Sequence, residues 1–492
     1  MRQIKANINS VKGKLNRYFS ECIGAGRAAE VMRHVAYEQL CTLQRESHFN
    51  YIRFHGLFHD EMAVAYRAAD GKIRYNFQYV DLLFDSLLDA EIRPVVELGL
   101  MPEALAATQE RVFWWQMNKS MPKEMSEWYD LVYETVKHFT ERYGECEVKK
   151  WYFEVWNEPN LAGFFTDSDK PESYFRLYDA AARAVKAVCA DYRVGGPATA
   201  GPNWIDELLA YCKEHSTPID FISAHQYGVE GAFDEDGTRL TRIKPVNYII
   251  DIIKDAGDKC HKMGLPLLMT EWSTSYSCRD PIHDSYYSSA YILEVIKRCE
   301  GYADMLSYWV YTDIFEEVEP AKTMFHGGFG LFTVRSVPKP SYHTYRMLAS
   351  LADTELSSTD PSSYICKDDE KLQILFWNNV TPDIGDEVNL KYFKKPLPAA
   401  KIEDATVEIA GLEPGKSYEV TVESIGYRMG DCYNAFLDGG YGEHLAREET
   451  AELIEKSKPK KISYTKSADA CGTLVLTVAQ TENQSDMITV SL

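Results

Sequence analysis

The sequence predicts an α/β protein in which a TIM-type (β/α)₈ barrel is followed by a C-terminal antiparallel β-sandwich carrying a short helical insertion. Three observations predict it. The chain has 492 residues, more than one ordinary domain. Over roughly the first 345 residues, short apolar or aromatic runs alternate with longer amphipathic stretches, as in successive β–α units. Beyond residue 349 the segments instead alternate every second residue, divided by Pro, Gly, Asn and Asp.

Eight segments have the composition of buried parallel strands. Runs such as PVVELG and PLLMTEW are almost continuously apolar, which suits strands covered by helices on one face and packed inside a barrel on the other. About 20 to 50 residues separate neighbouring segments, enough for a helix each time. The expected strands span residues 20–26, 50–56, 93–99, 151–159, 193–199, 220–228, 265–273 and 305–313.

The segments between these strands have helical periodicity. Residues 28–45 place six apolar side chains at near-3.6 spacing: Ala28, Val31, Met32, Val35, Leu40 and Leu43. Residues 124–142, 174–190 and 285–298 repeat the pattern. An open doubly wound sheet is the competing fold, but it normally opens with a glycine-rich phosphate loop, which GAGRAAE at 24–30 resembles only weakly.

The C-terminal part contains segments that read as sandwich strands: KLQILFWNN, DEVNLKYF, DATVEIAGL, KSYEVTVESIGY, GTLVLTVAQ and DMITVSL. Residues 3–9 alternate in the same way. We therefore expect a catalytic barrel over residues 13–347 and a β-sandwich over 348–492, with residues 1–12 pairing with the sandwich. A helical insertion is expected at about 444–458.

The composition restricts the class of partner. Lys and Arg number 53 and Asp and Glu 74, giving a formal net charge of −21. This balance argues against nucleic acid, whose binders carry a basic surface, and against an anionic membrane. No apolar run is long enough to span a bilayer. A neutral small molecule or glycan is the easiest partner to accommodate.

The cysteines and the N-terminal segment favour a cytoplasmic protein. Eleven Cys are scattered along the chain without a CxxC pair, and the first residues contain no apolar signal region. His55, His59, His225 and His326 do not stand in a metal-ligand spacing, so neither a metal nor a cofactor is expected.

Two glutamates stand at the carboxyl ends of expected strands, where a barrel enzyme carries its reacting groups. Glu158 follows Asn157 at the end of one strand, and Glu271 ends another. A single such Glu is more often a salt-bridged rim residue. Two of them, together with Trp156, Trp272 and Trp309 at strand ends, favour a saccharide site, because cleavage of a glycosidic bond needs one protonated and one ionised carboxyl.

Five motifs give the chain a resemblance to a known family. They are RFHGLFHDEM (53–62), FEVWNEPN (153–160), SAHQYG (223–228), LMTEWSTSY (268–276) and FHGGFGLF (325–332). These motifs resemble family 39 of the glycoside hydrolases, the β-xylosidases and α-L-iduronidases, which are retaining barrel enzymes. With the trailing sandwich, the resemblance covers nearly the whole chain.

The resemblance implies a role for individual residues. Glu158 would be the general acid/base and Glu271 the nucleophile, while Asn157 would bond the sugar 2-hydroxyl. His225 and Tyr227 would hold the two acids in place. The remaining positions would contact the sugar or wall the pocket: His55, Tyr276, Trp309, with a non-proline cis peptide after it, Glu316 in preference to Glu317, Phe113 and Phe164.

The expected activity is that of an exo-acting retaining glycosidase that releases β-D-xylose from the non-reducing end of short xylo-oligosaccharides. An α-L-iduronidase would need a cation aimed at C5, and Arg53 should lie too deep. That activity, an α-L-arabinosidase, an endo-acting glycanase and an inactive glycan-binding barrel stay as alternatives. Loops at 101–123, 228–245 and 314–330 offer material to close one end of a cleft. A homo-oligomer is also plausible, and the resemblance implies a tetramer.

Overall fold

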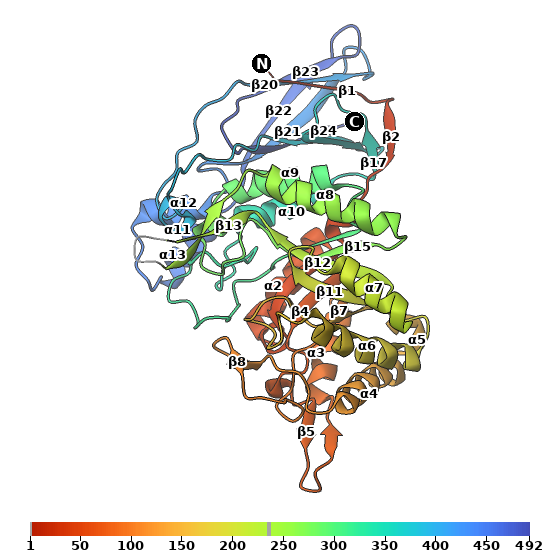
Figure 1. Ribbon diagram of the computed structural model, residues 1–492. Coiled ribbons are helices and arrows are strands. Elements are labelled where there is room, and N and C mark those ends of the chain that lie inside the picture. Colours follow the sequence, from red (N-terminus) through yellow and green to blue (C-terminus); the bar gives the residue numbers. More distant parts are fainter. Residues whose placement is uncertain (1, 234–237) are drawn as a thin grey trace.

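Eight parallel strands form a closed barrel in the computed structural model, which describes residues 2–233 and 238–492 (Figure 1). Their order around the barrel is β10-β11-β12-β15-β16-β3-β4-β7. The predicted barrel and all eight predicted strand positions are therefore confirmed. The strands are β3 (Cys22–Arg27), β4 (Tyr51–His55), β7 (Arg93–Leu98), β10 (Tyr152–Val155), β11 (Arg193–Ala200), β12 (Phe221–Tyr227), β15 (Leu267–Ser273) and β16 (Met305–Tyr308).

One main helix follows each barrel strand and covers its outer face. Apolar stripes such as Trp128, Val132 and Phe139 on α4 are fully buried against the barrel. The helices are α2 (His34–Ser47), α3 (Gln78–Asp89), α4 (Met125–Tyr143), α6 (Pro171–Val188), α7 (Ile205–His215), α8 (Asn247–Lys262), α9 (Tyr287–Cys299) and α10 (Pro340–Ser350). Among the described residues no helix combines the length and the apolar character needed to cross a membrane.

The first predicted helix differs from the structure. Residues 28–45 form two helices, α1 (Ala28–Val31) and α2, rather than one. Met32 and Val35, predicted on the buried face, are each 37% exposed. The break lies at Arg33, whose guanidinium turns toward the barrel mouth and forms a bidentate pair with Glu316. Tertiary ion pairing therefore overrides a continuous helical pattern here.

The C-terminal unit consists of two packed sheets. A seven-stranded sheet has the order β2 (Val11–Lys14), β17 (Thr354–Leu356), β18 (Ser363–Lys367), β19 (Lys371–Trp377), β24 (Ser485–Ser491), β21 (Ser417–Ile425) and β22 (Lys460–Ser467). The second sheet contains β1 (Arg2–Asn7), β20 (Ala405–Ala410) and β23 (Leu474–Val478). Figure 1 shows red β1 beside the blue strands, and β1 pairs in parallel with β20. Apolar residues of both sheets, including Ile4, Ile374 and Val407, form one core.

The prediction of a strand at DEVNLKYF was wrong. This segment contains the short helix α11 (Asn389–Tyr392). Asn389 is fully buried, accepts a hydrogen bond from the Ile243 backbone and donates one to Asp280. These polar ties to the barrel loops replace a sheet ladder. Two further helices follow, α12 (Cys432–Gly439) and α13 (Arg447–Lys456). Because α10 packs on α2 and α9, we propose that the barrel ends after α10 rather than at residue 347.

Candidate active site

A cavity of about 520 Å³ opens at the carboxyl ends of the barrel strands and contains both glutamates singled out by the sequence. An apolar cluster fills the barrel below it, formed by side chains such as Val95, Phe221 and Met305. The cavity is therefore a pocket above a packed core rather than a channel. Eight of the eleven predicted site residues line it: His55, Phe113, Glu158, Phe164, Tyr227, Glu271, Tyr276 and Trp309.

Glu158 is held by an unusual backbone at the end of β10. Both Trp156 and Glu158 adopt positive φ, at 71° and 43°. For residues with a Cβ this conformation costs about 1–3 kcal/mol and is most often found at functional sites. The Trp156 amide donates to Leu98 of β7, and the Glu158 amide donates to Ala198 of β11. These two bonds fix the strand end and direct the carboxyl into the cavity.

Glu271 reaches the cavity because of an irregularity in β15. The ladder with β12 pairs Ala224 with Met269 and His225 with Glu271, so one extra residue, Thr270, lies on β15. A bulge of this kind re-aims the side chains that follow it. Thr270 and Glu271 consequently both face the barrel interior, where Thr270 donates a hydrogen bond to Glu154 and Glu271 lines the cavity.

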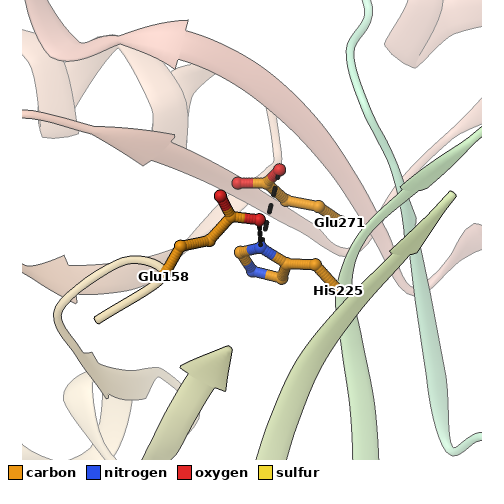
Figure 2. Close-up of side chains that lie close together, drawn as sticks. All are labelled: Glu158, His225 and Glu271. Atoms are coloured by element: carbon orange, nitrogen blue, oxygen red, sulfur yellow. Dashed lines mark hydrogen bonds and ion pairs between the residues drawn. The ribbon is translucent and has the colours of Figure 1, made fainter. Parts of the chain in front are cut away.

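The two carboxyl groups lie close together, and one ring nitrogen of His225 is directed at both (Figure 2). His225 Nδ1 lies 2.9 Å from Glu158 Oε1 and 3.6 Å from Glu271 Oε2. Carboxyl oxygens of the two glutamates lie within 4.8 Å of each other. Retaining glycosidases hold their carboxyls at about 5–5.5 Å and inverting ones at about 6.5–9.5 Å, so the observed proximity agrees with the retaining arrangement.

Glu271 is surrounded by hydrogen-bond donors. Tyr227 donates its hydroxyl to Glu271 Oε2 at 2.5 Å, and Arg53 donates to Oε1 at 2.7 Å. Arg53 has no exposed side-chain surface and also pairs with Glu154 at 2.5 Å and Glu97 at 3.0 Å. A fully buried cation of this kind fixes the carboxylates around it and favours an ionised Glu271.

The two carboxyl groups lie in different electrostatic environments, which favour a protonated Glu158 and an ionised Glu271. Burial raises the pKa of Glu158 well above its ordinary value, and the neighbouring Glu271 and Glu317 raise it further. Burial also raises the pKa of Glu271, but Arg53 and His55 oppose the effect with positive charge. We therefore assign the proton of the pair to Glu158. The arrangement can donate a proton on one side and present an anion on the other.

The histidines also differ. Although burial opposes it, the carboxylates of Glu97 and Glu271 raise the pKa of His55, whose Nδ1 lies 2.7 Å from Glu97. Burial, together with Arg53 and His55, lowers the pKa of His225 well below its usual range. His225 is therefore neutral near pH 7 and shares a hydrogen bond with Glu158 without adding charge.

Three predicted site residues do not line the cavity. His225 contacts Glu158, which lines the cavity, and Asn157 precedes Glu158 and accepts a hydrogen bond from the buried Arg53. Glu316 lies outside, where its carboxylate is bound by Arg33 and Arg27 at 2.6–3.2 Å. Its neighbour Glu317 lines the cavity instead, and burial raises the pKa of Glu317 to about 8. The preference for Glu316 over Glu317 is therefore reversed in the structure.

Aromatic side chains wall the cavity. Trp309 is 2% exposed, and a cis peptide joins it to Val310, as predicted. Its indole packs on Gly24, where an added Cβ would lie 2.5 Å from Trp309 Cε3. Gly24, the first glycine of the GAGRAAE segment, thus makes room for an aromatic ring rather than a phosphate. Phe113 and Phe164 also line the cavity, and their rings are 5.2 Å apart in an edge-to-face contact.

Several functional residues escaped the sequence reasoning. Glu97 and Glu154 are acids inside almost wholly apolar strands, the same signal that singled out Glu158. Both bind Arg53 and support the site from below. Arg239, at the start of β14 (Arg239–Ile243), also lines the cavity. It lies in a hairpin with β13 (Val229–Phe233), and no strand-end rule points to it.

Glu158, His225 and Glu271 form a group whose geometry would also suit a metal ion, with ligand atoms within 4.8 Å of one another. The charges nearby oppose a cation, because the Arg53 guanidinium already binds Glu271 and His55 Nε2 lies 3.5 Å from it. The expectation of no metal stays a prediction.

A barrel whose aromatic-walled pocket contains one protonated and one ionised carboxyl group has the architecture of a glycoside hydrolase. The model of a family described as glycosyl hydrolases family 39 matches residues 2–474, and this chain belongs to that family.

Three relatives illustrate the similarity. The chain is 36% identical over 467 residues to a β-xylosidase of Caldicellulosiruptor saccharolyticus, covering 93% of this chain and 92% of the relative. It is 38% identical over 379 residues to a β-xylosidase of Geobacillus stearothermophilus, covering 75% of each. The crystal structure of a monomeric β-xylosidase from Caulobacter crescentus CB15 superimposes with a TM-score of 0.95 at 36% identity, covering 100% of this chain and 99% of that one.

Proposed function

We propose that this protein is an exo-acting retaining β-xylosidase that releases β-D-xylose from the non-reducing end of short xylo-oligosaccharides. The main support for this reaction is the pair of Glu158 and Glu271, whose carboxyl oxygens lie within 4.8 Å of each other and whose environments favour a proton on Glu158 and a charge on Glu271. The choice of xylose rests on similarity to proteins named β-xylosidases over most of the chain.

In the first proposed step, a Glu271 oxygen attacks C1 of the sugar while the bond from C1 to the leaving oxygen breaks. Glu158 transfers its proton to that oxygen, and the leaving group departs as a neutral alcohol. The product is a covalent xylosyl ester on Glu271. Tyr227 and Arg53 hold the carboxylate in place for the attack, because each donates to one of its oxygens.

In the second step, the ionised Glu158 accepts a proton from a water molecule that attacks C1 on the face just vacated. The bond from C1 to Glu271 breaks, and xylose leaves with the configuration of the substrate. Glu158 regains its proton and Glu271 its charge, so the starting state returns.

The residues proposed to hold the glycone have free hydrogen-bonding capacity. Asn157 accepts a bond from Arg53 through Oδ1, while its buried Nδ2 has no partner among the described residues. This amide can donate to a sugar 2-hydroxyl beside C1. Trp309 supplies a flat apolar face, and Glu317 and His55 supply polar atoms on the same side of the cavity.

Exo action is supported by the loops around the cavity. The hairpin of β8 (Arg111–Val112) and β9 (Met117–Asn118), the β13–β14 hairpin and the 314–330 segment contribute Phe113, Glu230, Glu317 and Phe329 to its wall. Part of the 228–245 loop, residues 234–237, lies outside the described residues. Walls on several sides favour the binding of a chain end over that of a continuous polymer.

The proposal is tested with 4-nitrophenyl glycosides and proton NMR of the first anomer released. We expect 4-nitrophenyl β-D-xyloside to be the best substrate and β-xylose to be the first product. A preference for the α-L-iduronide or the α-L-arabinoside would replace the proposed sugar. Release of α-xylose first would contradict retention, and internal cleavage of long xylan would contradict exo action.

Replacing Asn157 by Ala is expected to lower kcat/KM on the β-xyloside by about 10²-fold, because contacts to the 2-hydroxyl strengthen in the transition state. The 2-deoxy substrate provides the control. On 4-nitrophenyl 2-deoxy-β-D-xyloside, wild type and Asn157→Ala should differ by less than about threefold. An equal loss on both substrates would mean that Asn157 acts only through Arg53.

Glu317→Gln is expected to move the alkaline limb of the kcat/KM profile to lower pH. Activity falls with rising pH as Glu158 loses the proton that it must donate. Glu317 is ionised above its own pKa of about 8, and its charge there raises the pKa of Glu158, so its removal should lower the pKa of Glu158. Glu230→Gln is the control, because Glu230 also lines the cavity but is paired with Lys244 at 3.0 Å. An unmoved limb in Glu317→Gln would contradict the assignment.

We further propose a cytoplasmic location and, by family resemblance, a homo-oligomer. All eleven cysteines are free thiols, and burial raises the pKa of Cys22 and Cys299 to about 12, which suits a reducing compartment. Light scattering checks the assembly against the chain mass of 56.2 kDa. A single mass at that value would match the monomeric Caulobacter relative and overturn the tetramer.

A further inference from the structure

The lining of the cavity can be divided into two halves by the barrel strands that its residues belong to or follow. Residues that follow β16, β4 and β7 form one half, which contains Trp309, His55 and Glu317. Residues that follow β10, β11 and β12 form the other, which contains Glu158 and the β13–β14 hairpin. Under the proposed function the leaving group departs past Glu158, so the second half faces the aglycone.

Arg239 is the cation of the aglycone half. In the hairpin ladder Arg239 pairs with Phe233, and Gly231 lies diagonally across from it. Because Gly231 has no side chain, the guanidinium can lie over it: Nε and Nη2 are 3.6 and 3.7 Å from the point where a Cβ would stand. The hydroxyl of Tyr276 lies 3.4 Å from the same point. Glycine thus allows Arg239 to reach the cavity wall beside Tyr276.

The described acids around this half are neutral or paired with other cations. Glu158 is protonated in the resting site because its pKa is raised. Glu230 is paired with Lys244 at 3.0 Å and with Arg242 at 3.8 Å. Glu271 is paired with Arg53. Within residues 2–233 and 238–492, no carboxylate forms an ion pair with Arg239. An exposed guanidinium at a cavity wall is suited to a carboxylate, which it can bind with two parallel hydrogen bonds.

We propose that Arg239 is a specificity-determining residue that selects aglycones bearing a carboxylate, such as xylo-oligosaccharides with an acidic branch next to the scissile bond. The inference rests on the proposed β-xylosidase activity and extends it to the leaving-group side. It also gives Arg239 a role distinct from binding a C5 carboxylate of the glycone.

The test compares phenyl β-D-xyloside with 3-carboxyphenyl β-D-xyloside, whose phenols are of similar acidity. At low salt, wild type should favour the carboxylated substrate in kcat/KM by about fivefold, the range of an exposed ion pair. Arg239→Gln should reduce that ratio to about one. Arg239→Lys should retain part of the preference, and 0.5 M NaCl should weaken it in wild type.

Arg242→Gln is the matched control on the same strand. Arg242 binds the backbone carbonyls of Glu387 and Asp386 and does not line the cavity, so its replacement should leave the ratio unchanged. An equal ratio in wild type and Arg239→Gln would overturn the inference while leaving the xylosidase intact. Failure of wild type to hydrolyse phenyl β-D-xyloside would instead overturn the proposed function and this inference together.

Discussion

Replacing Glu271 by alanine is expected to lower kcat by about 10⁵-fold or more on every xyloside, whatever the leaving group. Without this carboxylate no group lies within reach of C1 to form the covalent intermediate. Activated aryl xylosides should not escape the loss, because a good leaving group replaces the need for an acid but not for a nucleophile. Steady-state assays on 4-nitrophenyl and 2,4-dinitrophenyl β-D-xyloside measure it.

The Glu271→Ala variant also leaves Arg53 without one of its three carboxylate partners, so stability needs its own control. Glu271→Gln keeps the size of the side chain and can still meet Tyr227 and Arg53. Both variants should be equally inactive, whereas the alanine variant should lose more thermal stability, because only glutamine can still form hydrogen bonds with Arg53 and Tyr227.

Azide distinguishes the role of Glu271 from a structural one. In Glu271→Ala, azide can enter the space of the lost carboxylate and attack C1 directly, giving α-xylosyl azide with inverted configuration. Glu230→Ala, which removes a cavity acid outside the proposed chemistry, should retain most activity and form no azide adduct. Substantial turnover by Glu271→Ala without azide would refute the assignment of the nucleophile.

The barrel was predictable because its strands and helices carry repeated physical patterns. Buried parallel strands must be apolar on both faces, and their covering helices must repeat every 3.6 residues, so eight strand positions could be read locally. Glu158 and Glu271 followed from the same reading, because a charge at the end of an apolar strand stands out. The prediction of one continuous helix over residues 28–45 was wrong because Arg33 pairs with Glu316, which is distant in the sequence.

The support around the glutamates was harder to predict. Alternation along β15 does not place Thr270 and Glu271 on one face, and only the bulge opposite His225 does so. Arg53 acquires its role from three acids on three different strands. Glu316 and Glu317 lie in a loop without periodicity, so nothing local indicates which of the two points inward. Arg239 depends on a glycine diagonally across a hairpin. Each of these is a long-range relation.

Replacing Glu158 by alanine is expected to produce losses that depend on the leaving group. On xylobiose, whose leaving alcohol needs a proton, kcat/KM should fall by about 10²–10⁴-fold, the usual contribution of a positioned acid. On 2,4-dinitrophenyl β-D-xyloside the first step should be almost unaffected. The second step still needs a base, so the xylosyl ester on Glu271 should accumulate and give a burst of dinitrophenol before slow turnover.

Azide should rescue Glu158→Ala with the opposite stereochemistry to Glu271→Ala. It attacks the accumulated ester from the side that Glu158 occupied and needs no base, so turnover should rise and β-xylosyl azide should form with retained configuration. The alkaline limb of the wild-type pH profile should also disappear, because the group whose raised pKa produces it is gone. Equal losses from Glu158→Ala and Glu271→Ala on the dinitrophenyl substrate, with no burst, would refute the division of roles. That division depends on Arg53, Tyr227 and His55 stabilising the charge of one carboxyl while burial keeps the proton on the other.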